Sequence, residues 1–369
     1  MLIIRRWFSR YFNDPQVIGL AIVLLLGFGV VIFFGGMLAP VLASLVLAYL
    51  LEGLVRVLER WGLPRMPAVL LVFTLFFTVL VLVLFALLPV LTRQLAQLVE
   101  QIPQMLSKGQ ELLLRLPQEY PNWFSEEEIR AMILTVRSEL VDFGQRIVAS
   151  LSYQSVVVLV TLLVYLILVP FLVFFFLKDK GLLMNWIASY LPRERGLATS
   201  VWHEVNQQVG NYVRGKFIEI LLVWLVTYIT FSVMNLQFSM LLAVMVGLSV
   251  IVPYVGAAVV TLPVAAVAYA QFGLGNEFLY VMIAYAVIQA LDGNVLVPVL
   301  FSEVVNIHPV AIIVAILVFG GIWGFWGVFF AIPLATLTQA ILRAWGSLPD
   351  ELEPQRELEL ERGPGRLQD

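Results

Sequence analysis

The sequence contains no cysteine, which excludes disulfides, thiolate nucleophiles and cysteine-based metal sites and leaves the redox compartment undetermined. Charged residues are also scarce, at 13% of the chain, whereas hydrophobic residues reach 61% and the mean hydropathy is +0.95. No lysine or arginine occurs between Ile220 and Leu342. The ionisable residues of that stretch are Glu277, Asp292, Glu303 and His308. This composition excludes a soluble domain and predicts an all-α integral membrane protein.

The composition and the absence of known motifs also exclude several functional classes. The net charge of −3 provides no basic surface for nucleic acid. The sequence has no G-x-S-x-G, no glycine-rich phosphate loop followed by Lys-Ser/Thr and no HExxH, so we expect no enzyme and no catalytic residues. ATP-driven transport by this chain alone is excluded for the same reason. We expect no metal centre and no cofactor beyond a coupling ion.

About eight hydrophobic segments approach the length of a membrane span. The first two, 17–35 and 37–55, are joined by Gly35 and Gly36 alone, which predicts a tight hairpin. The remaining segments are 67–91, 154–177, 217–236, 239–272, 279–300 and 310–342.

Basic residues gather at 5–10, 56–65 and 178–216, which the positive-inside rule assigns to the cytoplasm. Both termini are then cytoplasmic. The polar insert between the third and fourth spans is extracytoplasmic, and Ser125 with Glu128 forms a capping box that predicts a helix within it. The apolar seam of this helix suits packing within the subunit or contact between subunits.

The predicted organisation has five parts. They are spans one to three at 1–91, the extracytoplasmic helical insert at 92–153, spans four and five at 154–236 with a cytoplasmic amphipathic helix at 192–216, a discontinuous-helix transport region at 237–342, and an acidic, disordered cytoplasmic tail at 343–369. At the start of the fifth span, Glu219 is expected to be an interfacial residue paired with Lys216.

Proline and glycine interrupt the later spans. Pro253 and Gly256 interrupt the sixth segment, and Gly293 and Pro298 follow Asp292 in the seventh. Irregular backbone at membrane depth is tolerated where it is buried in protein or lines a cavity, and such segments are typical of transporter binding sites. A kinked span is the simpler alternative for each segment. Two similar interruptions favour discontinuous, re-entrant helices that meet near the membrane midplane.

Asp292 is the first candidate site residue because a charge inside a span is costly unless it faces a partner or a wet cavity. Gln289, Asn294 and Tyr254 add polar groups suited to Na⁺, a proton or a small solute. The alternative is a helix cap at the membrane surface, since Asp-Gly-Asn is also a good turn sequence.

Two further groups of residues are weaker candidates. Glu303 and His308 suit a gate or a proton relay, or else an ordinary surface loop. Gly320, Gly324 and Gly327 predict close helix packing of the GxxxG kind, with an aromatic substrate wall as the alternative.

Four strings together resemble the autoinducer-2 exporter family, and within it the PerM-type permeases. They are FFFLKDK at 174–180, VPYVGA at 252–257, ALDGNVLVPVLFSE at 290–303 and FGGIWGFWGVFFAIPLAT at 319–336. The resemblance covers nearly the whole chain. It implies a multi-pass protein of the bacterial inner membrane that forms homo-oligomers, pentamers among them, and works as an elevator-like carrier. Family members are associated with autoinducer-2 export or Na⁺/H⁺ antiport.

The resemblance also implies a structural role for Pro253, Gly256 and Pro298 and a site role for Asp292 and Asn294. We therefore expect a secondary transporter, partnered by the lipid bilayer, that moves a small solute or ion by alternating access and couples it to Na⁺ or H⁺. A non-transporting scaffold or assembly protein is the alternative, and a passive pore is a third.

Overall fold

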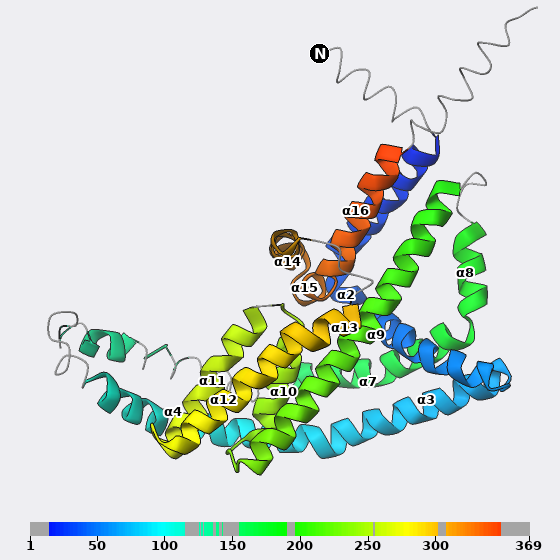
Figure 1. Ribbon diagram of the computed structural model, residues 1–369. Coiled ribbons are helices and arrows are strands. Elements are labelled where there is room, and N and C mark those ends of the chain that lie inside the picture. Colours follow the sequence, from blue (N-terminus) through cyan, green and yellow to red (C-terminus); the bar gives the residue numbers. More distant parts are fainter. Residues whose placement is uncertain are drawn as a thin grey trace, which may run out of the picture. The chain divides into compact units, whose positions relative to one another are not determined.

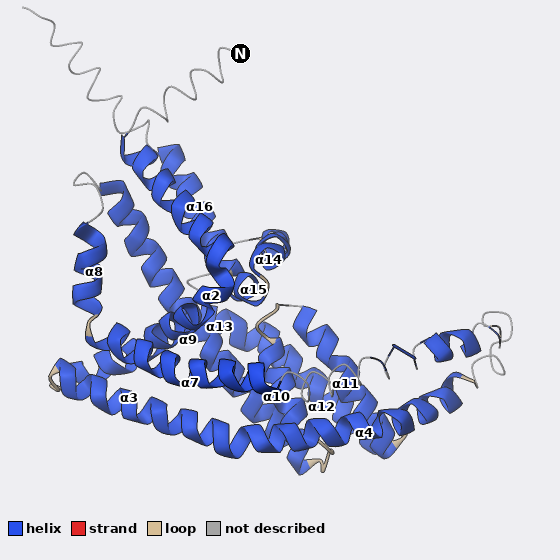
Figure 2. Cartoon of the chain, turned by 180° about the vertical axis from the view of Figure 1, so that it is seen from behind, coloured by secondary structure: helices blue, strands red, loops and turns tan. Residues whose placement is uncertain are grey.

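The computed structural model describes residues 15–114, parts of 125–142, and residues 155–189, 196–253, 255–301 and 308–347. Within these residues every regular element is a helix and none is a strand (Figures 1 and 2), which confirms the predicted all-α class. In the described part of the chain, six helices are long and apolar enough to cross a membrane. Two shorter apolar helices, Ser239–Ser249 and Val310–Trp323, accompany them.

The chain divides into two compact units, which we call unit 1 and unit 2. Unit 1 comprises residues 1–39, 179–213 and 301–369, and unit 2 comprises residues 40–178 and 214–300. This division differs from the predicted boundary at 237, since residues 214–300 belong with 40–178. The predicted transport region, 237–342, therefore draws on both units.

The first long helix, α2, runs over Pro15–Arg60 and contains Gly35 and Gly36 in its interior. The predicted hairpin at these glycines is wrong. Each glycine costs about 1 kcal/mol in a helix, but the neighbouring Phe34 and Met37 provide no polar group to complete a turn inside an apolar segment. A continuous helix that crosses a membrane once has its ends on opposite sides. The predicted cytoplasmic location of both groups of arginines, at 5–10 and at 56–65, therefore loses the support that a hairpin would have given it.

The helices α3 (Arg65–Leu82), η1 (Val83–Leu87) and α4 (Leu88–Leu113) follow one another directly and form one helical path (Figure 2). The predicted end of the third span at residue 91 lies inside α4, so the polar insert begins as a continuation of this helix. One apolar stripe of α4, which includes Leu91 and Leu95, packs on the core formed by α10 and α11.

The rest of the insert is described only in part. Backbone hydrogen bonding from Ile129 to the carbonyl of Ser125 begins a helical turn there, and Ile129 and Ile133 are buried. Glu128 and the later positions of the predicted seam lie outside the described residues.

The predicted amphipathic helix at 192–216 and the fifth span at 217–236 form a single helix, α9 (Gly196–Val233). Helices α10 (Ser239–Ser249) and α11 (Val255–Phe272) follow, and a turn that contains Pro253 separates them. Gly256 allows the close approach of the two helices, because a Cβ there would lie 1.8 Å from the carbonyl oxygen of Ser249. The sixth segment is thus interrupted where its proline and glycine predict it.

The seventh segment behaves differently. Helices α12 (Asn276–Leu291), η2 (Asp292–Leu296) and α13 (Val297–Phe301) follow one another without a gap and form one candidate span, Asn276–Phe301. The prediction of a broken helix between Asp292 and Pro298 is therefore wrong. The helix accommodates Gly293 and Pro298 by widening into the π-helix η2, which keeps the backbone hydrogen-bonded.

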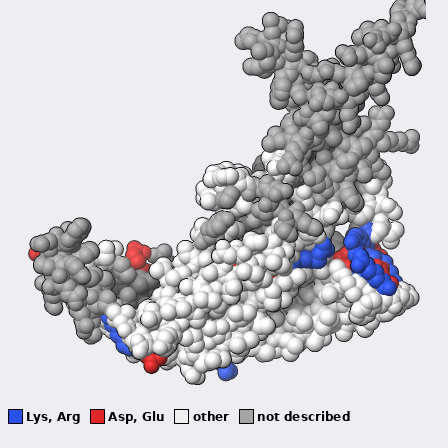
Figure 3. Space-filling model, viewed as in Figure 1, with Lys and Arg blue, Asp and Glu red and all other residues white. Residues whose placement is uncertain are grey.

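The described part of unit 2 has two apolar cores. One joins α9, α10, α11 and α12 through buried side chains such as Val246, Val264 and Val281. The other joins α2 and α3 to α7 (Ser155–Lys178) through residues such as Val55, Val69 and Val173. Figure 3 shows a broad white surface over these helices, with most of the coloured charged side chains gathered near the turn between α2 and α3. An apolar surface between charged ends is typical of a lipid-facing protein.

In unit 1, helix α14 (Pro309–Trp323) packs against α15 (Phe325–Phe329) and α16 (Ala331–Ser347). Gly324, at φ +58° and ψ −131°, forms the turn between α14 and α15 rather than part of a helix face. Gly320 and Gly327 lie where the two helices come closest, because a Cβ on Gly327 would meet the carbonyl of Phe319 at 1.8 Å. These glycines thus serve a tight helical hairpin within the chain.

The remaining helix of unit 1 is α8 (Lys180–Ser189). The first half of α9 also belongs to unit 1, where the buried hydroxyl of Tyr212 donates a hydrogen bond to the carbonyl of Phe329 at 3.0 Å. Helix α16 continues past the predicted start of the tail at 343, and residues 348–369 lie outside the described part of the chain.

Candidate functional site: a buried charge cluster

The strongest candidate site lies in unit 2 and comprises Lys216, Glu219 and Asp292, which we call the charge cluster. Lys216 and Glu219 lie on α9 at i and i+3, and their charged atoms are 2.6 Å apart. Both residues are almost completely buried, at 3% and 1% exposure. Taking two charges out of water is costly, so an ion pair at this depth is maintained only by close contact and further hydrogen bonds.

Lys216 makes the further hydrogen bond with the backbone at the end of α10. Its ammonium donates to the carbonyl of Val250 at 3.0 Å. That carbonyl lies at the negative end of the α10 dipole, where a cation is favoured. Val250 immediately precedes the turn with Pro253, so Lys216 ties α9 to the place where the α10–α11 path is interrupted.

Asp292 completes the cluster from α12. It is 8% exposed and begins the π-helix η2, an element that is frequent at functional sites. Its charge interacts with those of Lys216 and Glu219. Its Oδ1 atom is buried and has no hydrogen-bond partner among the described residues. A buried carboxylate oxygen without a donor leaves a binding position for a cation or a proton.

The charges of the cluster do not balance. One ammonium faces two carboxylates, so the fully ionised cluster carries one net negative charge within the candidate spans Asn206–Val233 and Asn276–Phe301. A buried unpaired charge costs several kcal/mol. One bound monovalent cation or one proton restores neutrality. Among the described residues, no three acidic or histidine side chains come together as a metal site. The charge cluster therefore does not resemble a multidentate site for a divalent cation.

Polar side chains continue along α12 from Asp292 towards α11. Gln289, one turn earlier, has a buried amide nitrogen and interacts with the hydroxyl of Tyr285. A further turn away, the hydroxyl of Tyr285 donates to the carbonyl of Ala257 at 3.0 Å and lies 3.2 Å from the hydroxyl of Thr261. The site therefore sits at one end of a row of polar groups within otherwise apolar helices.

The other predicted site residues lie differently. Asn294 is exposed, and its amide donates to the carbonyl of Ala290 at 2.8 Å on its own helix, so it does not join Asp292. Gly293 faces open space and Pro298 is exposed. Pro253 is half-buried in the α10–α11 turn, and Tyr254 lies outside the described residues.

The predicted gate residues are described only in part. Glu303 lies outside the described residues. His308 is exposed and caps α14, since its Nδ1 accepts a hydrogen bond from the backbone of Val310 at 3.2 Å. This capping role accounts for His308 without a relay.

The sequence predicts that Glu219 lies at the membrane interface, and the burial of Glu219 corrects that prediction. The pairing with Lys216 is confirmed, but both residues lie inside unit 2. One feature of the sequence indicates their importance: Lys216 is the last lysine or arginine before Arg343. A single lysine at the edge of a long stretch without cations is the natural partner for a carboxylate within that stretch.

The helices and their buried charges define a multi-pass integral membrane protein with a polar site inside its spans. Residues 20–347 match the model of the AI-2E family transporters, so the chain belongs to that family. It is 48% identical over 340 residues to the “Putative permease PerM” of Escherichia coli K12, a match that covers 92% of this chain and 96% of the relative. It is 26% identical to the “Putative transport protein YueF” of Bacillus subtilis, over 84% of each chain. A “Putative transport protein” of Thermotoga maritima is 22% identical over 91% of this chain and 96% of its own length.

Proposed function

We propose that this protein is a secondary transporter of the bacterial inner membrane that moves a small solute or ion by alternating access and uses a cation bound at Asp292 as the coupling ion. The observation that carries the proposal is the net negative charge of the charge cluster together with the unpartnered Oδ1 of Asp292. The cation is a proton or Na⁺, because one positive charge neutralises the cluster.

The position of the cluster suits coupling. Lys216 contacts the end of α10 beside an interruption of the helix path, and Asp292 lies at a π-helix. Both are places where the backbone departs from regular α-helix, and such departures are frequent at functional sites. Neutralising Asp292 changes the balance of charges around Lys216 and hence the strength with which Lys216 holds the end of α10. Cation binding thereby favours one arrangement of the interrupted helix over another.

The experiment uses proteoliposomes with an imposed Na⁺ or pH gradient, in which ²²Na⁺ uptake and the interior pH are followed. A low-molecular-mass extract of bacterial cytoplasm, present or absent, supplies the solute. We expect the wild-type protein to dissipate the gradient faster than empty liposomes, and Asp292→Asn to abolish this flux. The matched control is Glu277→Gln, which removes an exposed carboxylate at the start of the same helix and should leave the flux unchanged.

Wild-type protein that moves neither ion, with or without the extract, contradicts ion coupling and favours the scaffold alternative. Normal flux in Asp292→Asn removes the assigned role of Asp292. We further propose that the α2–α3 turn and residues 178–205, the part of the predicted cytoplasmic stretch 178–216 that precedes the candidate span Asn206–Val233, face the cytoplasm, because both carry basic residues. Single cysteines introduced at the exposed position 61 and at position 181 should react with an impermeant thiol reagent only from the cytoplasmic side.

A further inference from the structure

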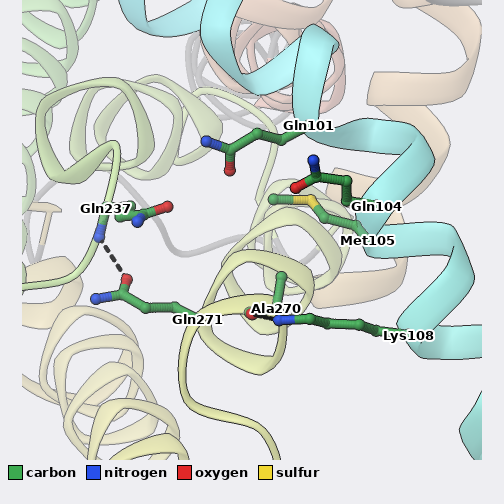
Figure 4. Close-up of a pocket in the computed structure, with 7 residues that line it drawn as sticks. All are labelled: Gln101, Gln104, Met105, Lys108, Gln237, Ala270 and Gln271. Atoms are coloured by element: carbon green, nitrogen blue, oxygen red, sulfur yellow. Dashed lines mark hydrogen bonds between the residues drawn. The ribbon is translucent and has the colours of Figure 1, made fainter.

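A second polar site lies at the other end of unit 2, in a cavity of about 300 Å³ between α4, α11 and the loop that precedes α10 (Figure 4). Gln101, Gln104 and Lys108 line it from α4, while Gln237 and Gln271 face them. The volume is at the lower end of the range of small-molecule sites. The candidate spans Asn206–Val233 and Val255–Phe272 both end next to it, so the cavity lies at a boundary between membrane and water.

Hydrogen bonds hold the walls of this cavity in place. Lys108 donates to the carbonyl of Ala270, and the hydroxyl of Tyr269 donates back to the carbonyl of Lys108 at 3.3 Å. Gln271 accepts from the backbone nitrogen of Gln237 at 2.7 Å and donates to the carbonyl of Asn235 at 2.8 Å. A site whose walls are already ordered loses little conformational entropy when a ligand enters.

The backbone around Gln237 is unusual. Asn235, at φ +52°, and Phe238, at φ +56°, flank it in the left-handed region. Asparagine adopts this conformation readily, but a bulky residue such as phenylalanine rarely does. Strain of this kind persists where the surrounding structure enforces it, and it clusters at binding and catalytic sites. The strained loop presents Gln237 to the cavity, which is an observation separate from the cavity itself.

The chemistry of the lining selects the ligand. Among the described residues that line the cavity, Lys108 is the only charged one and none is a carboxylate. Its ammonium has three N–H donors, one of which is directed to Ala270. The four glutamine amides offer both donors and acceptors, which suits hydroxyl groups as well as anionic oxygens.

We infer that this cavity binds a small monoanion that carries hydroxyl groups, of the hydroxycarboxylate class, with the carboxylate at Lys108 and the hydroxyls at the glutamines. The site is independent of the charge cluster, and its occupancy does not require ion-coupled transport. The probe is gluconate, a hydroxylated monoanion, and sorbitol is its neutral counterpart of similar size. Binding of each to the purified full-length protein in lipid nanodiscs is measured by titration calorimetry.

The key variant is Gln104→Glu, which keeps the size of an exposed side chain and introduces a negative charge that opposes a bound carboxylate. Gln110→Glu makes the same change on another face of α4, outside the cavity lining, and is the matched control. We expect gluconate to bind more tightly than sorbitol, Gln104→Glu to weaken gluconate binding by about tenfold or more, and Gln110→Glu to leave it unchanged.

Lys108→Met should also abolish the preference for gluconate over sorbitol, although it removes the contact with Ala270 as well. Gln104→Glu leaves that contact in place, so the test does not depend on how α4 tolerates the loss. Absence of gluconate binding, equal affinity for gluconate and sorbitol, or equal gluconate affinity in Gln104→Glu and the wild-type protein overturns the inference.

Discussion

The buried ion pair of the charge cluster predicts a specific pattern of mutational effects. Replacing Lys216 with methionine keeps an apolar stem of similar length but leaves Glu219 and Asp292 as two buried carboxylates without a cation. Removing one partner of a buried pair costs about 3–5 kcal/mol. An exposed pair would cost about 0–1 kcal/mol. Because Lys216 and Glu219 are 3% and 1% exposed, the larger range applies.

The companion variant Glu219→Gln should be milder. Lys216 retains its hydrogen bond with the carbonyl of Val250 and the nearby charge of Asp292, so its positive charge stays compensated. In the double variant Lys216→Met/Glu219→Gln, the pair disappears together with its desolvation penalty. We therefore expect the double variant to be more stable than Lys216→Met alone. The interaction between the two substitutions should be about 1–3 kcal/mol, as for residues in one network.

The assay is reversible unfolding of the purified protein in mixed micelles, with the free energy extrapolated to zero denaturant for the wild-type protein, both single variants and the double variant. Lys216→Met combined with Asp292→Asn should recover part of the lost stability, since it removes a second uncompensated charge. A cost below about 1 kcal/mol for Lys216→Met, or strict additivity of the two single variants, would refute the assignment of a buried and coupled cluster.

Three further predictions concern stability. Gly256→Ala should destabilise the protein by about 1–3 kcal/mol or more, because the added Cβ would meet the carbonyl of Ser249 at 1.8 Å. Gly293→Ala should stabilise the protein by about 0.5–1 kcal/mol, because its Cβ would meet only open space in a helix. Equal effects of the two substitutions in thermal unfolding would contradict both predictions. Asp292→Asn should raise the unfolding free energy by about 1–2 kcal/mol while it abolishes flux, as expected where a functional site stores an unpaired charge; a loss of stability would contradict this. Arg65→Met should lower the unfolding free energy by about 1–2 kcal/mol, because the guanidinium donates to the last turn of α7 at 2.8 Å, and an unchanged value would show that this contact is not structural.

Features that depend on local residues could be predicted from the sequence. Asp292 was identified from the sequence because a lone carboxylate in an apolar segment has few explanations, and the α10–α11 turn because Pro253 and Gly256 act on their own backbone. The same reasoning failed at Gly35 and Gly36, where glycine permits a turn but does not require one. Because no polar turn residues flank these glycines, the helix continues through them.

Contacts between distant residues could not be predicted. The hydrogen bond between Lys216 and Val250 joins positions 34 residues apart, and a single sequence holds no record of it. The π-helix at Asp292 was also missed, since Gly293 and Pro298 are equally compatible with a break, a kink or a widened turn. The packing of neighbouring helices decides among these, and composition does not reveal it.

The central claim is that the carboxylate of Asp292 binds the coupling cation, and infrared difference spectroscopy of the protein in lipid tests it most directly. The carboxyl C=O stretch is recorded as the pH is lowered in the absence of Na⁺ and then as Na⁺ is added, for the wild-type protein, Asp292→Asn and the control Glu277→Gln. We expect a carboxyl signal that responds to pH or to Na⁺, persists in Glu277→Gln and is absent from Asp292→Asn. Identical difference spectra for the wild-type protein and Asp292→Asn would contradict the claim.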